Sequence, residues 1–85
     1  MKFAVVIEKA ENNYSAYVPD LPGCVTTGRT PEETRELIRE AIAFHLEGML
    51  LNGEAVPEAT THCCEVEIDP EQVRAALRGE QGETV

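Results

Sequence analysis

A helix-start signal at Thr30–Glu33 divides this 85-residue chain and limits its possible folds more than any other feature. Threonine can cap a helix, proline is tolerated at the first helical position, and Glu33 completes an S/T-x-x-E capping box. From there, apolar residues recur at three- and four-residue steps until Asn52-Gly53, where a helix can end. The pattern predicts one long amphipathic helix. Its buried stripe consists of Leu37, Ile38, Ala41, Ile42, His45 and Met49.

The residues before this helix favour β-structure. Lys2–Glu8 is apolar on both faces, which predicts a central strand covered on both sides. Tyr14–Val18 alternates in polarity and is expected to pair back through a turn at Glu11–Asn13. The segment Pro19–Gly23 (PDLPG) cannot continue a strand, because its prolines remove backbone donors and its glycine permits positive φ. We therefore expect a tight connection to a third antiparallel strand at Cys24–Thr27, closed by glycine.

A further strand and a short helix are expected after the long helix. Residues 54–61 read as a loop. Beyond them, Cys64, Val66 and Ile68 alternate with polar residues, which predicts a half-buried strand with one acidic face. A strand that follows a helix in this way is expected to lie parallel to the first strand, through a right-handed crossover. Asp69 and the proline after it repeat the cap signal, so a helix should run to about Arg78.

The expected order is thus β-β-β-α-β with a short C-terminal helix, an α+β fold. We expect one domain over residues 1–78 and a disordered tail at 79–85. One long helix covers one face of the sheet, so the other face, with Ala4, Val6 and Tyr17, would stay exposed without a partner. A core of this size leaves little stability margin, which favours association as a dimer or tetramer.

Composition excludes some classes of function. Sixteen acidic against seven basic residues give a formal charge of −9, which repels phosphate and argues against direct nucleic-acid binding. The same charge would speed the encounter with a basic protein, although acidity also simply keeps proteins soluble. Three cysteines, two of them adjacent at Cys63 and Cys64, do not suggest a disulfide framework. With no leader and no apolar stretch of about 20 residues, we expect a cytoplasmic protein without a membrane span.

The segment Tyr14–Thr34, YSAYVPDLPGCVTTGRTPEET, followed by an amphipathic helix, resembles the HicB family of bacterial antitoxins. The likeness covers about residues 1–68. The matching positions are Tyr17, Pro19, Asp20, Leu21, Pro22, Gly23, Cys24, Thr27, Gly28, Thr30, Glu32 and Glu33.

The resemblance implies a partial ribonuclease-H-like fold with the same β-β-β-α-β order. It also implies a partner, HicA, a small RNA-cleaving toxin with a double-stranded-RNA-binding-like fold, which the antitoxin covers and silences. Many family members carry a second, DNA-binding module after this domain. The residues after the expected fourth strand are too few for such a module and are not basic, so the resemblance carries over to the antitoxin domain alone.

Two functions remain open at this stage. The first is an antitoxin-like module that neutralises a HicA-type toxin, and the second is a stand-alone regulatory or ligand-binding domain without a toxin. The Pro19–Gly23 connection either only shapes the turn or presents a rigid binding edge. If the connection presents a binding edge, the candidate partner-binding residues are Tyr17, Asp20, Leu21, Cys24 and Glu33.

Catalytic and metal-binding interpretations are weaker. The carboxylates Glu8, Glu65, Glu67 and Asp69 could converge as in a ribonuclease, but their positions suit strand ends and a solvent-facing strand face. His62-Cys63-Cys64 contains metal-ligating residue types, yet adjacent residues of a strand point to opposite faces, so a core or edge cysteine is expected. His45 lies in the helix stripe and is expected to be structural. We predict no enzyme activity, no metal and no cofactor.

Overall fold

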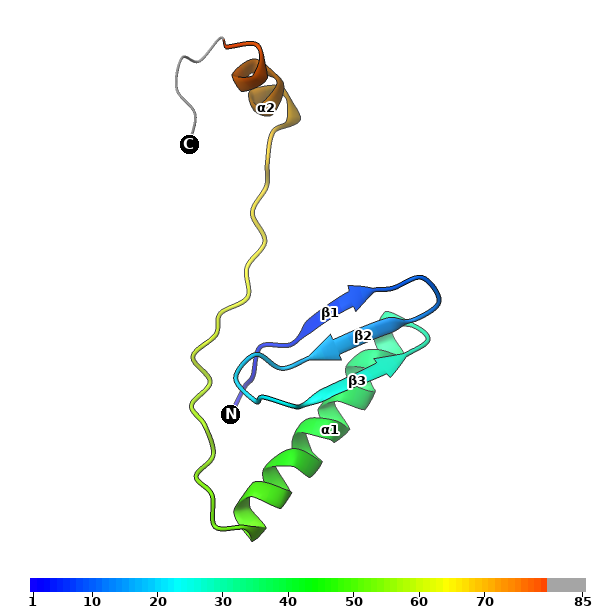
Figure 1. Cartoon of the computed structure of the whole chain (residues 1–85), viewed down its shortest axis with the longest axis vertical. Helices are drawn as coiled ribbons and strands as arrows, with labels where there is room; N and C mark the ends of the chain where they lie inside the picture. Colours follow the sequence, from blue (N-terminus) through cyan, green and yellow to red (C-terminus); the bar gives the residue numbers. More distant parts are fainter. Residues whose placement is uncertain (80–85) are drawn as a thin grey trace.

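Three antiparallel strands packed on one long helix form the body of the chain in the computed structural model, which describes residues 1–79 (Figure 1). The elements are β1 (Val6–Lys9), β2 (Tyr14–Tyr17), β3 (Val25–Gly28), α1 (Pro31–Leu51) and α2 (Pro70–Leu77). The α+β class, the hairpin order and both helices agree with the sequence-based expectation. Residues 80–85, which belong to the expected disordered tail, lie outside the described residues.

The sheet has the order β1-β2-β3, and each neighbouring pair is antiparallel. Its register aligns Val6, Tyr17 and Val25 in one row across the three strands, and Ile7, Ala16 and Thr26 in the next. Successive residues of a strand point to opposite faces. The second row therefore faces α1, where Ala16 is buried, and the first row faces away from it.

Helix α1 begins and ends where its signals predict. The Thr30 hydroxyl accepts a hydrogen bond from the Glu33 backbone N–H at 3.0 Å, which satisfies one of the N–H groups left without a partner at a helix start. At the other end, Asn52 is the C-cap and Gly53 has a φ of 74°, the left-handed conformation that glycine adopts readily. Local chemistry alone thus sets the length of this helix.

The core lies between α1 and the inner face of the sheet. Five buried apolar residues form it, and Leu21 and Ile38 are 0% and 1% exposed. The half-buried side chains of Phe3, Val5, Ala41, Ile42 and Leu46 pack around them. Thr34 in the first turn of α1 is also buried, and its hydroxyl donates to the Thr30 carbonyl at 2.7 Å. One layer of helix on one layer of sheet accounts for the whole core, as expected for a domain this small.

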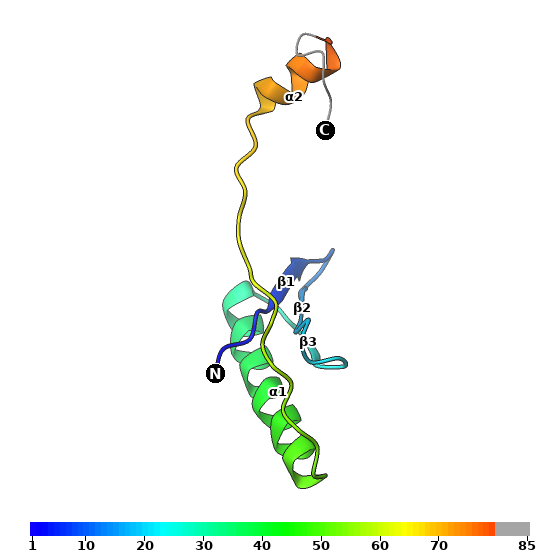
Figure 2. The same ribbon diagram turned by 90° about the vertical axis from the view of Figure 1, so that its left-hand side faces the viewer.

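The expectation of a fourth strand beside β1 is wrong for the single chain. Residues 54–69 contain no strand. They follow an extended path that first returns past the body from the end of α1 and then leads away from the sheet, so that α2 lies beyond the body (Figures 1 and 2). Consequently β1, expected to be a central strand, is an edge strand. The Cα radius of gyration is 18.5 Å and the chain measures 59 × 31 × 17 Å, whereas a compact chain of this length would have a radius of about 12 Å.

Helix α2 has its own cap but no packing partner among residues 1–79. The Asp69 carboxylate accepts from the Glu71 backbone N–H at 2.9 Å, and an ion-paired cluster links Glu71 to both Arg74 and Arg78. Its two apolar anchors, Val73 and Leu77, are 49% and 84% exposed. The helix is therefore held by local contacts only.

Candidate protein-binding surfaces

No element of the described residues covers the outer face of the sheet, and this face carries an apolar row. Tyr17 at its centre is 42% exposed and Val25 beside it is 64% exposed, while Val6 on the other flank is half-buried. All three lie on hydrogen-bonded strands, so their positions are fixed by backbone pairing. A tyrosine between two β-branched residues on a rigid surface is a typical anchor of protein interfaces, because it loses little conformational entropy on binding.

A polar row lies next to the apolar one on the same face. Glu8, Ser15 and Thr27 are aligned across the strands by the same register. Glu8 and Thr27 are exposed. The outer face thus combines an apolar centre with a carboxylate and hydroxyls at its side, the composition expected of a surface that binds a polar or basic protein.

The connection between β2 and β3 is anchored inward rather than presented outward. Val18 and Cys24 are joined by a hydrogen bond from the Val18 N–H to the Cys24 carbonyl at 3.1 Å, and Leu21 bonds to both at 3.0 Å within that turn. These nested turns direct the Leu21 side chain into the core, where it is fully buried, and Cys24 is 3% exposed. Burial also raises the pKa of the Cys24 thiol. Of the predicted partner-binding residues, Leu21 and Cys24 therefore have no surface to offer a partner here.

Asp20 is occupied within the chain. Its Oδ2 accepts from the backbone N–H groups of Thr60 and Thr61 at 3.0 and 2.9 Å, and its Oδ1 accepts from their hydroxyls at 3.2 and 2.8 Å. The Thr61 N–H contributes most to holding the pKa of Asp20 below 3.8, followed by the Thr61 hydroxyl and the Thr60 groups. We call this set of contacts the Asp20 clamp. It ties the segment after α1 to the β2–β3 connection.

Glu33 serves the start of α1. Its carboxylate accepts from the Arg29 backbone N–H at 2.6 Å, and the Arg29 guanidinium lies 3.5 Å away. This backbone hydrogen bond is the main reason why the pKa of Glu33 is lowered. The capping box predicted from the sequence is therefore present, with the reciprocal bond made one residue before the cap. Among the five candidate partner-binding residues, Tyr17 alone is both exposed and free of a structural role in residues 1–79.

A second apolar surface, which the sequence did not indicate, lies on the distal half of α1. Phe44 and Leu51 are 80% and 81% exposed, and with Gly48 they follow the i, i+4, i+7 spacing of one helix face. A shallow hollow lined by Pro22, Phe44 and Gly48 connects this face to the β2–β3 connection. The one feature of the sequence that could have indicated this surface is Phe44, an aromatic residue outside the apolar stripe of the helix.

The residues considered for catalysis or metal binding do not come together. No group of three or more His, Cys, Asp or Glu side chains within residues 1–79 is placed to hold a metal ion. Glu8 lies in β1, whereas Glu65, Glu67 and Asp69 lie in the extended segment. Cys63 and Cys64, expected in the core or at an edge, are exposed in the single chain. His45 is half-buried.

Neither helix of the described part of the chain is long and apolar enough to cross a membrane.

The fold and its uncovered face define a small α+β domain with an open three-stranded sheet. The family of HicB-like antitoxins of bacterial toxin–antitoxin systems matches residues 3–76. The chain belongs to this family, as its Tyr14–Thr34 segment suggested.

Two relatives show how widely the domain occurs. The chain is 40% identical over 68 residues to a UPF0150 protein of Thermoplasma acidophilum, a match that covers 73% of this chain and 99% of that protein. It is 42% identical over 59 residues to a 14.9 kDa protein encoded in the rep–hol intergenic region of Haemophilus phage HP1. That match covers 69% of this chain but 44% of the phage protein, so the chain spans less than half of the phage protein's length.

A solved structure shares the fold. One chain of a structure titled "HicA3 and HicB3 toxin-antitoxin complex" is 24% identical, with a TM-score of 0.58. The match covers 93% of this chain and 84% of that chain.

Proposed function

We propose that this chain is an antitoxin that neutralises a small basic HicA-type RNA-cleaving toxin by covering its active or RNA-binding surface. The observation that carries the proposal is the uncovered row of Val6, Tyr17 and Val25 on a rigid sheet. Family membership supports an antitoxin role, and the relatedness in fold to a chain of a toxin–antitoxin complex fits it.

Electrostatics supports a basic partner. The chain carries a formal charge of −9, and Glu8 stands next to the apolar row on the same face. A toxin that binds RNA needs a cationic surface to neutralise phosphates. Such a surface would be attracted to this chain before contact, and the apolar row would then supply the short-range contacts that slow dissociation. The toxin's RNA-binding surface is therefore the part that we expect to be covered.

The proposal has three further parts. The chain acts by binding and not by catalysis, it acts in the cytoplasm, and it does so as a homo-oligomer. We also propose that the sheet is a partial ribonuclease-H-like sheet. That fold has a fourth strand beside β1, which the described residues of the single chain do not supply.

Growth rescue tests this function. A HicA-type toxin encoded beside this chain would be expressed alone and together with the wild-type chain, and affinity would be measured on the purified pair. We expect the wild-type chain to restore growth and the double variant Tyr17→Ala/Val25→Ala to bind the toxin at least about 30-fold more weakly, the loss typical of an interface anchor. Leu77→Ala, which removes an apolar side chain on α2 that is more exposed than either Tyr17 or Val25, is the matched control.

Two outcomes would count against the proposal in different ways. A wild-type chain that neither binds the toxin nor restores growth would favour the stand-alone regulatory domain. A double variant that binds as tightly as wild type would show that the toxin docks elsewhere, with the Phe44 face as the next surface to examine.

A further inference from the structure

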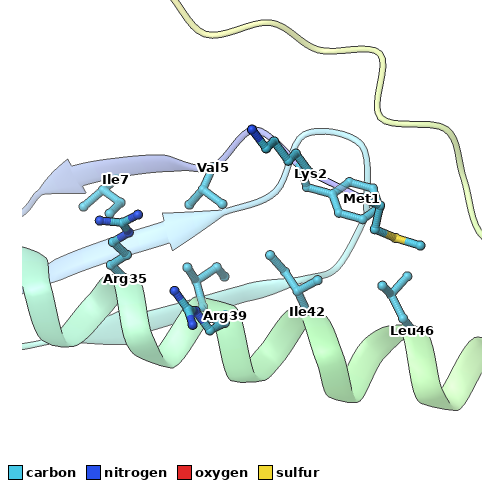
Figure 3. Close-up of a pocket in the computed structure, with 10 residues that line it drawn as sticks. Met1, Lys2, Val5, Ile7, Arg35, Arg39, Ile42 and Leu46 are labelled. Carbon is cyan, nitrogen blue, oxygen red and sulfur yellow. The ribbon is translucent and has the colours of Figure 1, made fainter.

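An open groove runs between the free edge of β1 and helix α1 (Figure 3). Its floor is apolar and is formed by Val5, Ile38, Ile42 and Leu46, with Ile7 exposed at one end. The groove has a volume of about 770 Å³. Along one side, β1 has no neighbouring strand within residues 1–79, so its outward backbone N–H and C=O groups are available to an added strand.

The rim of this groove is positively charged. Lys2, Arg35 and Arg39 line it, three of only seven basic residues in a chain of charge −9. Lys2 and Arg35 have no carboxylate within 4.0 Å among residues 1–79, and the Arg39–Glu36 pair is exposed and 4.0 Å long. A positive rim around an apolar floor therefore favours an extended occupant that has one apolar face and a negative net charge.

One segment of this same chain fits that description. In residues 62–69, the side chains of Cys64, Val66 and Ile68 alternate with acidic ones at Glu65 and Glu67. Val66 is 75% exposed and Ile68 is 63% exposed, and residues 62–69 form no strand. Eight residues in a strand span about 26 Å, enough to follow the whole of β1. Within residues 1–79, the chain thus has a segment with the alternation of a strand that pairs with no sheet, and a sheet edge that pairs with no strand.

The path of the chain keeps the two apart. The Asp20 clamp fixes Thr60 and Thr61 against the β2–β3 connection, and from that point the segment leads away from the sheet and places α2 far from it (Figures 1 and 2). The likeness to the solved chain covers 93% of the residues, whereas residues 1–61 make up 61/85, or 72%, of them. The shared fold therefore extends into the C-terminal segment.

We propose that residues 62–69 of one copy add as a fourth strand to the β1 edge of a second copy, parallel to β1, and that the second copy returns the same strand. Cys64, Val66 and Ile68 would then cover the groove floor, and the acidic side chains would face outward. The arrangement is closed and reciprocal, since each chain gives one strand and receives one. It completes the sheet in the place where a β-α-β connection would put its last strand. This inference does not depend on the toxin partner.

Directed disulfide trapping tests the exchange. In a background with Cys63→Ser and Cys64→Ser, Val66→Cys would be combined in turn with Val5→Cys and with Ile7→Cys, whose side chains share the helix-facing side. We expect mild oxidation to join one of these pairs between chains, giving a covalent dimer on a non-reducing gel. Val66→Cys alone controls for a bond between two copies of position 66. Glu67→Cys combined with Val5→Cys, with a thiol on the opposite face of the segment, should not form a bond.

Sedimentation of the unmodified chain gives a second readout that needs no substitution. A mass of 18.6 kDa, twice 9.3 kDa, or a multiple of it agrees with exchange. In contrast, a monomer at every concentration overturns the proposal. Disulfides formed only within a chain would show that the strand pairs with its own β1, and no disulfide in either combination would show that the segment never reaches this edge. If toxin added before the oxidation prevented the covalent dimer from forming, the toxin would occupy the groove in place of the strand, and the groove would be a toxin site instead.

Discussion

Asp20 and Thr61, 41 positions apart in sequence, are joined by two hydrogen bonds, from the Thr61 N–H at 2.9 Å and from its hydroxyl at 2.8 Å. With the corresponding bonds from Thr60, this contact connects the body of the domain to its C-terminal segment. The aspartate of the Pro19–Gly23 connection thus sets where that segment leaves the sheet. Asp20 thus has an internal structural role, and the partner contact that the sequence suggested for it stays a prediction.

Asp20→Asn is expected to loosen the clamp. The substituted amide keeps one oxygen acceptor, but its nitrogen cannot accept the bonds that the second carboxylate oxygen receives. We expect faster proteolysis within residues 54–61 and unchanged helix content by circular dichroism. Glu58→Gln removes one charge from the same segment without removing a clamp bond and should behave like wild type. Equal protease resistance of Asp20→Asn and wild type would show that the clamp does not hold the segment.

Acid should release the clamp in the same way. The pKa of Asp20 is lowered by the clamp bonds, so its contribution is fully present above the ordinary value of 3.8 and is lost as the pH falls through the lowered pKa. At neutral pH this group gives no pH dependence. An acid titration followed by the amide chemical shifts of Thr60 and Thr61 should show a transition below pH 3.8 that is absent in Asp20→Asn. A transition above that value would contradict the assignment.

Gly28→Ala is expected to destabilise the domain. A Cβ at Gly28 would lie 3.0 Å from both the Cα and the backbone nitrogen of Thr34, and Thr34 is fully buried in the first turn of α1. Forcing this contact apart should cost about 1–3 kcal/mol of unfolding free energy, measured by urea denaturation at fixed protein concentration.

Gly48→Ala is the matched control, and it should raise the unfolding free energy where Gly28→Ala lowers it. Gly48 lies inside α1, and apart from the backbone of its own helix and its two chain neighbours no atom lies within 4 Å of the added Cβ, so the substitution should stabilise the domain by about 0.5–1 kcal/mol. If both substitutions destabilised the chain equally, close approach between β3 and α1 would not be the cause.

The three cysteines should differ in reactivity. Burial raises the pKa of the Cys24 thiol and shields it, whereas Cys63 and Cys64 are exposed in the single chain. Alkylation followed by mass spectrometry should modify Cys63 and Cys64 quickly in dilute protein and Cys24 only after denaturation. If strands are exchanged, Cys64 would face the groove. Its alkylation should then be slow in concentrated protein, whereas the alkylation of Cys63 should stay fast. Rapid modification of Cys24 in the native chain would contradict its place in the core.

Local chemistry made the helices predictable. The caps Thr30 and Asp69 and the stop at Asn52-Gly53 act within a few residues, so the sequence alone located both helices. The alternation of Tyr14–Val18 likewise indicated that Tyr17 points away from the core, and the observed register confirms it.

Long-range contacts were not predictable in the same way. The alternation in residues 62–69 predicted a strand that the structure does not contain, because an alternating pattern does not say whether a partner strand lies within reach. Thr60 and Thr61 gave no sign that they would bind Asp20, because the contact depends on the whole intervening helix. Nested turns buried Leu21 and Cys24 in a segment whose prolines and glycine suggested an exposed loop. Phe44 was not predictable because it lies outside the apolar stripe of α1, where the helix pattern indicates solvent.

The central claim is that this domain is incomplete until another chain supplies its fourth strand, and amide hydrogen exchange of residues 62–69 tests it most directly. Under strand exchange, these amides and the outward amides of β1 should exchange slowly in concentrated protein and quickly in dilute protein. Exchange that is fast at every concentration, or slow at every concentration, would contradict it, because the strand would then be unpaired or paired within its own chain.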